Sequence, residues 1–349
     1  MTPTAPEADN RVPIHVLTGF LGSGKTTLLR HLLGDPGLAD TAVVINEFGE
    51  TGLDHLLVRE VAEDVVLLSS GCLCCSVRDD LVSTLAELNA LMGAGRIPAF
   101  TRVVVETTGL ADPAPIMQAI LSEATLVSWS RLGLVITTVD AVNGEQTLGR
   151  HREARQQLAT ADRLILTKTD LVGEAEGEAL RGKLRAMNPS ASLLVSRKAQ
   201  LPAADILREP DGPWRTPAPP QLGPIIDSVI GAQPKAQPQG HGGSHDDAIK
   251  TFTVALRQPV DWPAFVEWLE LLLASRGDSI LRVKGLVALD DDERPVVVQG
   301  VQHVLYPIER LPAWPQATTA PGWIVFIARD LTQRAIENSI SSVYETRVA

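Results

Sequence analysis

The sequence predicts an α/β fold: a larger domain with a mostly parallel sheet, followed by a smaller α+β domain with an antiparallel sheet. Short, β-branched apolar runs alternate with longer helical patterns through residues 1–208, as in sheets that helices cover on both faces. A segment rich in Pro and Gly interrupts this alternation at residues 209–248. The chain of 349 residues is long enough for two such domains.

The strands and helices of the first domain follow one another in βαβ order. Its predicted strands are continuous apolar runs, which suit burial on both faces; they are residues 14–18, 41–45, 65–68, 102–105, 132–139 and 163–167. Its predicted helices have apolar positions at helical spacing; they are residues 25–33, 79–91, 114–123, 149–159 and 174–187. We therefore expect a mostly parallel sheet with helices on both faces.

The Pro- and Gly-rich segment divides the chain into a first domain of residues 1–208, a linker of residues 209–248 and a second domain of residues 249–349. The strand-like segments of the second domain are residues 251–256, 280–289, 295–305 and 323–328. Its helix-like segments are residues 261–275 and 331–342, with Asp261 and Asp330 as the predicted N-caps.

Composition and charge argue against several classes of protein. Lys and Arg number 31 and Asp and Glu 42, a net charge of −11, whereas a nucleic-acid-binding protein needs a basic face. The N-terminal residues lack the basic and apolar regions of an export signal, and no apolar run approaches the ~18–20 residues of a membrane span. Three cysteines are too few for a disulfide scaffold. We expect a cytoplasmic protein without membrane or nucleic-acid partners.

A glycine-rich phosphate loop lies between the first predicted strand and the first predicted helix. Residues 19–26 read GFLGSGKT and match the pattern G-x-x-x-x-G-K-[ST]. Glycines let backbone N–H groups surround phosphate oxygens, the lysine reaches the β- and γ-phosphates, and the threonine hydroxyl binds Mg²⁺. The motif predicts a P-loop NTPase domain, with Lys25 and Thr26 among its catalytic residues. The predicted nucleotide-binding residues of this loop are Gly19, Gly22, Ser23, Gly24, Lys25, Thr26 and Thr27.

The fourth predicted strand leads into an acidic residue, Glu106, and then Gly109. After a phosphate loop, this pattern is typical of a strand whose carboxylate faces the magnesium site, followed by a glycine that senses the γ-phosphate. We therefore place Glu106 among the catalytic residues and Gly109 among the nucleotide-binding residues.

A second nucleotide motif, Thr167-Lys168-Thr169-Asp170, closes the sixth predicted strand. Its spacing is that of the guanine-reading motif N-K-x-D, in which the carboxylate accepts two hydrogen bonds from guanine and the lysine stem stacks on the base. Adenine lacks this pair of donors, so the motif favours GTP over ATP. Thr167 stands where Asn is usual. We expect Thr167, Lys168 and Asp170 to bind the nucleotide; the alternative for Asp170 is an ordinary helix N-cap.

Two further segments contain residue types that bind metals. Cys72, Cys74 and Cys75 follow the third predicted strand. Three thiols beside a glycine suit a soft cation and leave a fourth zinc position open; copper(I), a redox role and inert packing are the alternatives. Glu47 and Glu50 follow the second strand, where a nucleotide switch would lie, and each positions the attacking water, binds metal or is solvated. We place Glu47 in the catalytic group and Glu50 in the metal group.

Taken in order, the motifs of the first domain resemble those of the CobW family of metallochaperone P-loop GTPases: GFLGSGKTTLL, NEFGE, GCLCCSVRDDL, ETTGLADP and TKTD. In the second domain, RVKGLVAL and VVQGVQHVLYP resemble the family's C-terminal domain. The resemblance implies a GTPase that uses GTP and Mg²⁺, binds Zn²⁺ or Co²⁺ at Cys72, Cys74 and Cys75, and delivers it to a client metalloprotein. Many relatives carry a His-rich run near the second domain; here His241 and His245 are either weak metal ligands or solvated linker residues.

Three functional hypotheses follow. The first is a GTP-hydrolysing metal chaperone that binds zinc or cobalt at the Cys-x-Cys-Cys motif and transfers it to a client, with GTP ordering the switch loops. The second is a GTP-dependent assembly or regulatory factor, of the cobalamin-synthesis or nitrile-hydratase-activator type, that binds a client without donating metal. The third is a small-molecule kinase on the same fold, which the guanine-reading motif disfavours.

Overall fold

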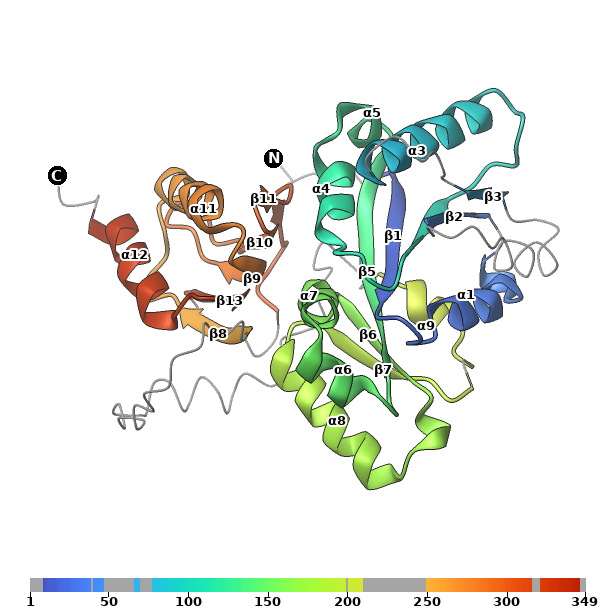
Figure 1. Cartoon of the computed structure of the whole chain (residues 1–349). Helices are drawn as coiled ribbons and strands as arrows, with labels where there is room; N and C mark the ends of the chain where they lie inside the picture. The colour runs from blue at the N-terminus through green and yellow to red at the C-terminus, as the bar shows by residue number, and fades with distance from the viewer. Residues whose placement is uncertain are drawn as a thin grey trace.

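The computed structural model describes residues 9–38, 40–46, 66–69, 77–198, 200–209, 249–315 and 321–345. They form a larger N-terminal domain around a parallel sheet and a smaller C-terminal domain around an antiparallel sheet (Figure 1). The predicted combination of an α/β and an α+β domain is thereby confirmed. Apart from Glu209, the predicted linker lies outside the described residues.

The N-terminal sheet has seven strands in the order β3-β2-β4-β1-β5-β6-β7, and every neighbouring pair is parallel. The strands are β1 (Val12–Gly19), β2 (Thr41–Asn46), β3 (Val66–Ser69), β4 (Arg102–Thr107), β5 (Ser130–Asp140), β6 (Arg163–Thr167) and β7 (Ser192–Val195). All six predicted strands are present. Strand β7 was not predicted, because its four residues are only half-buried at one edge of the sheet and form a short apolar run.

Helices cover both faces of this sheet (Figure 1). They are α1 (Lys25–Leu33), α3 (Val77–Gly93), α4 (Ala114–Ser122), α5 (Ala124–Val127), α6 (Gly144–Arg150), α7 (Arg152–Thr160), α8 (Glu174–Met187) and α9 (Ala203–Leu207), with 3-10 turns η1 (Pro36–Leu38) and η2 (Thr169–Leu171). The prediction of one helix over residues 149–159 is wrong. His151 is extended, with φ −110° and ψ 122°, and separates α6 from α7. Its ring packs 4.5 Å from the ring of Phe20 in the phosphate loop, a tertiary contact that helical periodicity cannot show.

The C-terminal sheet has six strands, and its strand pairs are antiparallel. The strands are β8 (Lys250–Ala255), β9 (Ile280–Val287), β10 (Val296–Val301), β11 (Val304–Leu305), β12 (Glu309–Arg310) and β13 (Gly322–Ala328). The single strand predicted at residues 295–305 is instead a hairpin of β10 and β11. Gln302 in its turn has a φ of 47°, the left-handed conformation that tight hairpin turns require.

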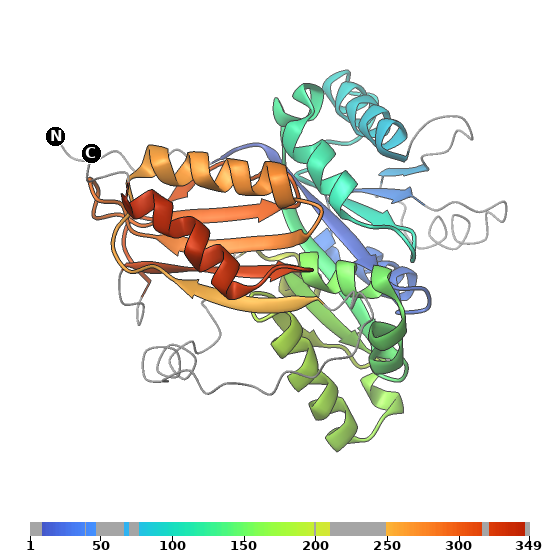
Figure 2. The same cartoon turned by 60° about the vertical axis from the view of Figure 1, so that its left-hand side comes forward.

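Two helices cover one face of the C-terminal sheet (Figure 2): α11 (Trp262–Arg276) and α12 (Gln333–Glu345). Asp261 caps α11 as predicted, because its carboxylate accepts a hydrogen bond from the Ala264 N–H at 3.0 Å. The predicted cap of α12 is wrong. Thr332, not Asp330, accepts from the N–H of Ala335 at 3.2 Å, and Asp330 adopts a left-handed φ of 52° just before the helix.

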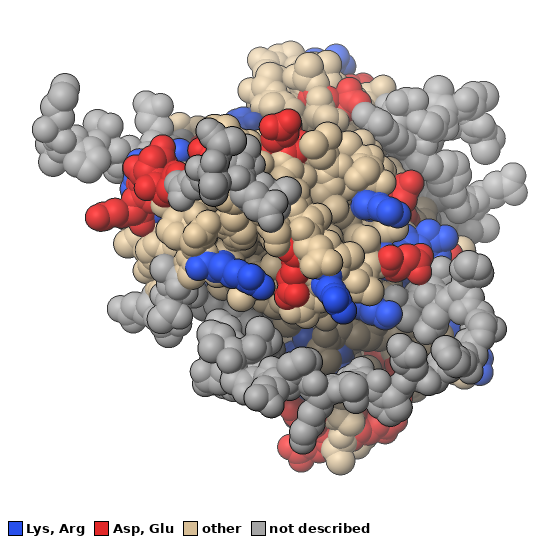
Figure 3. Space-filling view, turned by 90° about the vertical axis from the view of Figure 1, so that its left-hand side faces the viewer, with Lys and Arg blue, Asp and Glu red and all other residues tan. Residues whose placement is uncertain are grey.

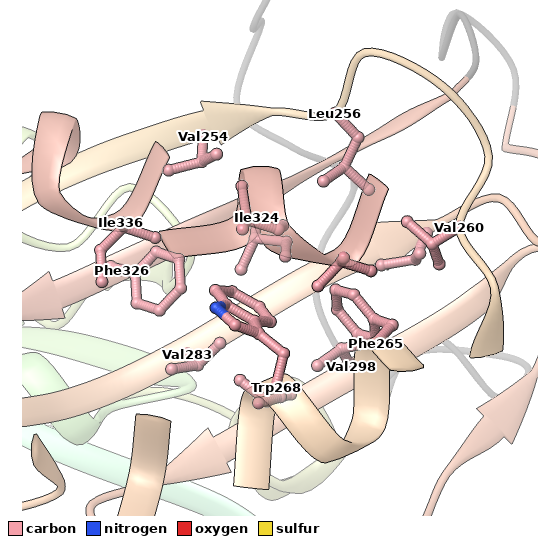
Figure 4. Close-up of a cluster of buried hydrophobic side chains, with 14 of the residues drawn as sticks. Val254, Leu256, Val260, Phe265, Trp268, Val283, Val298, Ile324, Phe326 and Ile336 are labelled. Atoms are coloured by element: carbon pink, nitrogen blue, oxygen red, sulfur yellow. The ribbon is translucent and has the colours of Figure 1, made fainter. Parts of the chain in front are cut away.

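The core of the C-terminal domain lies between these two helices and the sheet (Figure 4). Phe265 and Trp268 of α11 pack with their ring centroids 5.5 Å apart and lie in one cluster with Val283 and Phe326 of the sheet. Burying apolar surface of this kind contributes roughly 25 cal/mol per Å². The domain therefore has a hydrophobic core of its own.

A buried charged cluster joins the two domains. Asp162, directly before β6, has one carboxylate oxygen 2.6 Å from Arg282 and 2.7 Å from Lys284, both on β9. Burial lowers the pKa of Lys284 to about 8, despite its ion pair with Asp162. Burial also raises the pKa of Asp162, but the two cations outweigh this effect and hold that pKa below its usual range. Asp162 is thus the counter-charge of two buried cations.

Apolar contacts extend this interface on either side of the charged cluster. Ala159 of α7 packs with Leu281 and Ile327 of the C-terminal sheet. Val301, at the end of β10, belongs to a core cluster of the N-terminal domain that includes Met117 of α4. The C-terminal sheet is therefore packed against α7 and α4 of the N-terminal domain.

The face of the C-terminal domain that carries α11 and α12 has interspersed charges (Figure 3). Among its described atoms, Lys, Arg, Asp and Glu side chains lie scattered between uncharged residues and form no continuous basic stripe. None of the described helices is both long and apolar enough to cross a lipid bilayer.

Candidate functional site

The phosphate loop connects β1 to α1 at the carboxyl edge of the parallel sheet. Gly22 and Gly24 have φ values of 72° and 95°, a left-handed conformation that residues with a Cβ rarely adopt. A Cβ atom on Gly19 would lie 2.3 Å from the Thr138 hydroxyl oxygen of β5. These three glycines are therefore required by the path of the loop and by its close approach to β5.

Lys25 starts α1 and folds back over the loop. Its ammonium group donates to the carbonyl oxygens of Gly19 at 2.8 Å and Phe20 at 3.4 Å. Only 8% of the residue is exposed. The charge is thereby held inside the loop, where it can meet the β- and γ-phosphates of a nucleotide.

Thr26 and Glu106 meet across the loop. The Thr26 hydroxyl donates to the Glu106 carboxylate at 2.9 Å, and β1 and β4 pair in register at Leu17 and Glu106. Mg²⁺ prefers oxygen ligands, so this donor set fits the ion. The structure thus brings together the two residues that the sequence placed at the magnesium site.

The segment after β4 packs directly against the phosphate loop. A Cβ atom on Gly109 would lie 2.5 Å from the side chain and 2.8 Å from the backbone of Leu21. The carbonyl oxygens of Gly109 and Ala111 accept hydrogen bonds from the Gln157 side chain on α7, at 3.2 and 3.0 Å. Gln157 is fully buried and also lines a cavity of about 320 Å³ beside the loop. Gln157 was not predicted as a site residue, because neither its position in the helix nor its residue type distinguishes it.

The predicted base-reading motif is tied to the phosphate loop by two hydrogen bonds. Thr167 donates from its hydroxyl to the carbonyl oxygen of Ser23 at 2.7 Å. Lys168, with a left-handed φ of 57°, donates to the carbonyl oxygen of Gly22 at 2.7 Å and pairs with Asp140 at 2.8 Å. Burial raises the pKa of Asp140, but hydrogen bonds led by the one from Lys168 outweigh it and lower that pKa. The threonine therefore connects β6 to the loop although it is not the usual Asn.

The loop after β7 completes this end of the site. The exposed Asp170 accepts from the backbone N–H of Lys198 at 3.2 Å, and Thr169 donates to the carbonyl oxygen of Ser196 at 3.0 Å. Lys198 has a left-handed φ of 52°. Ser196 and Lys198 were not predicted as site residues, because β7 was not predicted. The signal in the sequence was the hydroxyl residue Ser196 directly after the short apolar run of β7.

The predicted metal residues lie outside the described part of the chain. They are Cys72, Cys74, Cys75 and Glu50, and the same holds for Glu47, His241 and His245. Within the described ranges, His, Cys, Asp and Glu side chains form no group of three that could hold a metal ion. Thr27, predicted to bind the nucleotide, lies exposed in the first turn of α1.

Two family models match the chain. The model described as "CobW/HypB/UreG, nucleotide-binding domain" matches residues 13–195. The model described as "Cobalamin synthesis protein cobW C-terminal domain" matches residues 249–343.

Characterised relatives and a solved structure resemble most of the chain. The zinc chaperone YjiA of Escherichia coli strain K12 is 34% identical over 295 residues, which cover 84% of this chain and 87% of the relative. The zinc chaperone CobW of Pseudomonas aeruginosa is 30% identical, with 95% and 91% covered. The zinc-regulated GTPase metalloprotein activator 1 of Schizosaccharomyces pombe is 34% identical over 54% of this chain and 47% of its own length. The crystal structure of Zn(II)-bound YjiA GTPase from E. coli superposes with a TM-score of 0.70 at 28% identity and covers 96% of this chain and 99% of that one.

Proposed function

The chain belongs to the CobW family, and from this premise we propose that it is a GTP-hydrolysing zinc chaperone that passes its metal to a client metalloprotein. The observation that carries the proposal is the joining of two motifs at one edge of the sheet. Thr167 and Lys168, which belong to the base-reading motif, donate to consecutive carbonyl oxygens of the phosphate loop at Ser23 and Gly22. A nucleotide on this loop would therefore have its base beside Asp170, a carboxylate that suits guanine.

The described residues support a division of labour in GTP hydrolysis. Lys25 holds a positive charge within the loop, where it neutralises negative charge that develops on the phosphates. Thr26 and Glu106 would supply oxygen ligands for Mg²⁺, which would neutralise negative charge on the nucleotide. Gly109, packed against Leu21, would sense the γ-phosphate. The sequence adds Glu47, which lies outside the described residues, to position the attacking water.

The metal site of the proposal is the Cys72, Cys74 and Cys75 motif, with Glu50 as an added ligand. Three thiolates favour Zn²⁺ or Co²⁺ and leave a position from which a client could take over the ion. Relatives named as zinc chaperones support zinc as the cargo. GTP would change the geometry at this motif by ordering the switch segment that contains Glu47 and Glu50, and hydrolysis would release it.

The test is a metal titration at two nucleotide states. Under reducing, anaerobic conditions, Co²⁺ is added to the full chain with Mg²⁺ and either GDP or a non-hydrolysable GTP analogue. We expect thiolate charge-transfer absorption, its loss in Cys74→Ser, and affinities that differ about 5- to 150-fold between the two nucleotides. Lys25→Ala is the matched control, since it should keep the absorption but lose the dependence on nucleotide.

Two outcomes would contradict the proposal in different ways. Equal metal affinities with GDP and the GTP analogue would remove the GTP-gated chaperone mechanism. Absence of metal binding in both states would favour a GTP-dependent assembly or regulatory factor that binds its client without donating metal.

A further inference from the structure

Helix α7 lies between the nucleotide site and the C-terminal domain and contacts both. We propose that Gln157 of α7 is a positioning residue of the GTPase site, and that Gln302 of the C-terminal domain acts on the same segment, residues 109–112, through Asp112. The C-terminal domain would thus set how readily the site hydrolyses GTP. This inference rests on the part of the proposed function that makes Gly109 the γ-phosphate sensor.

The first half of the connection runs from α7 to the nucleotide site. The Gln157 side-chain amide donates to both Gly109 and Ala111, so one buried side chain fixes two backbone carbonyls of the segment. The Thr137 hydroxyl of β5 donates to the backbone carbonyl oxygen of Gln157 at 2.8 Å and thereby holds that turn of α7 against the sheet. Since Gly109 packs against Leu21 of the phosphate loop, the amide of Gln157 sets how closely the segment approaches that loop.

The second half runs from the same segment to the C-terminal domain. One carboxylate oxygen of Asp112 accepts from Gln156 of α7 at 2.9 Å and from Gln302 at 3.4 Å. Its other oxygen accepts from the Ala114 N–H at 3.0 Å, in the first turn of α4. Asp112 is therefore shared by the nucleotide segment, α4, α7 and the C-terminal domain.

Buried contacts between the two domains hold Gln302 in position. Gln302 occupies the tight turn between β10 and β11, and its neighbour Val301 is buried in the N-terminal core. Asp162, two residues after α7 ends, pairs with two cations of β9. A shift of residues 109–112 on binding GTP must either break the Asp112 contacts or move α7 against the C-terminal sheet.

The coupling follows from these contacts and is reciprocal. If the Gln302 contact favours one position of the segment, it changes the affinities for GDP and GTP by different factors. A client that displaces the C-terminal domain would then change the rate of hydrolysis without touching the nucleotide.

The test compares three single variants of the full chain: Gln157→Met, Gln302→Leu and the control Gln333→Leu. Gln333 lies on α12 in the same domain as Gln302, and its side chain donates to Glu337 of the same helix at 2.7 Å. We expect Gln157→Met to lower kcat more than it weakens GDP binding. We expect Gln302→Leu to change the ratio of the affinities for a GTP analogue and GDP about 2- to 30-fold, and Gln333→Leu to leave it unchanged.

A double-mutant cycle then links Gln302 to the segment. Asp112→Asn and Gln302→Leu should change the affinity ratio non-additively if they act through one contact. Additive effects, or equal changes in GDP and GTP affinity, would overturn the coupling. Absence of GTP hydrolysis by the unmodified chain would instead overturn the proposed function, so the two failures are distinguishable. Thermal unfolding of each variant identifies any that act through lost stability.

Discussion

The hydroxyl of Thr167 donates to the carbonyl oxygen of Ser23 over 2.7 Å, so the end of β6 is joined to the middle of the phosphate loop. The same hydroxyl also lies 3.2 Å from the carbonyl oxygen of Val139 on β5. The Thr167 side chain thus connects the phosphate loop to the ends of two strands, β5 and β6. The usual Asn of this motif is not needed for that connection.

Replacing Thr167 by valine should weaken GTP binding. Valine has nearly the same shape but no donor, so the buried carbonyl of Ser23 loses its partner at a cost of about 1–3 kcal/mol. Part of this free-energy cost applies to the nucleotide-bound state of the loop. The dissociation constant for GTP should therefore rise several-fold, as measured with a fluorescent GTP analogue. Thr84→Val, on α3 and remote from the loop, is the control. Unchanged GTP affinity in Thr167→Val would show that the loop holds its shape without this bond.

Replacing Asp170 by asparagine should relax the choice of base. The amide presents a donor where guanine also has donors, whereas xanthine offers a carbonyl there. We expect weaker GTP binding and stronger binding of xanthosine triphosphate, measured by competition. Asp205→Asn, on the exposed side of α9, should change neither affinity. Loss of GTP binding with no gain for the xanthine nucleotide would indicate that Asp170 serves as a structural cap for the loop after β7.

Replacing Asp162 by asparagine should destabilise the fold strongly. Asparagine can still accept the hydrogen bond from the Val135 N–H, but Arg282 and Lys284 lose their buried counter-charge. Removing one partner of a buried ion pair costs about 3–5 kcal/mol, which urea unfolding at pH 7 would measure.

Two comparison variants make this test specific. Lys284→Met leaves one cation paired with one carboxylate. It should therefore lower the free energy of unfolding far less than Asp162→Asn. Glu145→Gln breaks the exposed ion pair with Lys183 and should cost at most about 1 kcal/mol. A cost for Asp162→Asn no larger than that of Glu145→Gln would mean that the charged cluster does not hold the domains together.

Protonation of His15 should make the protein less stable in acid. Its Nδ1 accepts from the Leu134 N–H at 3.0 Å, and burial lowers its pKa from 6.5 to about 4. Between these two pH values the unfolded chain binds a proton that the folded chain does not. The free energy of unfolding therefore falls as the pH falls from 6.5 to 4, by up to roughly 3 kcal/mol from this group.

Urea unfolding at several pH values checks this prediction. His15→Gln keeps a hydrogen-bond acceptor but cannot titrate, so its stability should vary less over this pH range than that of the unmodified chain. His31→Gln, on the exposed side of α1, is the control. The same pH dependence in His15→Gln and the unmodified chain would assign the acid sensitivity to other groups.

Local sequence patterns predicted the elements that carry the nucleotide site. The phosphate loop and Lys168 each follow a buried parallel strand, Glu106 lies at the end of another, and parallel strands bring their carboxyl ends to one edge. This is why segments as distant as Thr26 and Glu106, or Gly22 and Lys168, meet as expected. Helices with clear boundaries, such as α1 and α8, were also predicted with their observed bounds.

Features that depend on tertiary contacts were not predictable in this way. The helix breaks at His151, whose ring packs on Phe20, and the α7 glutamines hydrogen-bond to partners more than 40 residues away. Arg282 and Lys284 look like the polar face of an ordinary strand, but their partner, Asp162, lies 120 residues from Arg282. The cysteine motif is plain in the sequence yet lies outside the described residues.

Among the described residues, β3 is the last strand on its side of the N-terminal sheet, and the chain reaches the first cysteine three residues after β3 ends. The phosphate and base motifs instead follow the interior strands β1 and β6. Segments that connect strands over the protein surface vary more in sequence than the strands themselves. If the cysteines hold the metal as we propose, relatives could diverge in their choice of metal through changes after β3, while the nucleotide motifs on the interior strands stay the same.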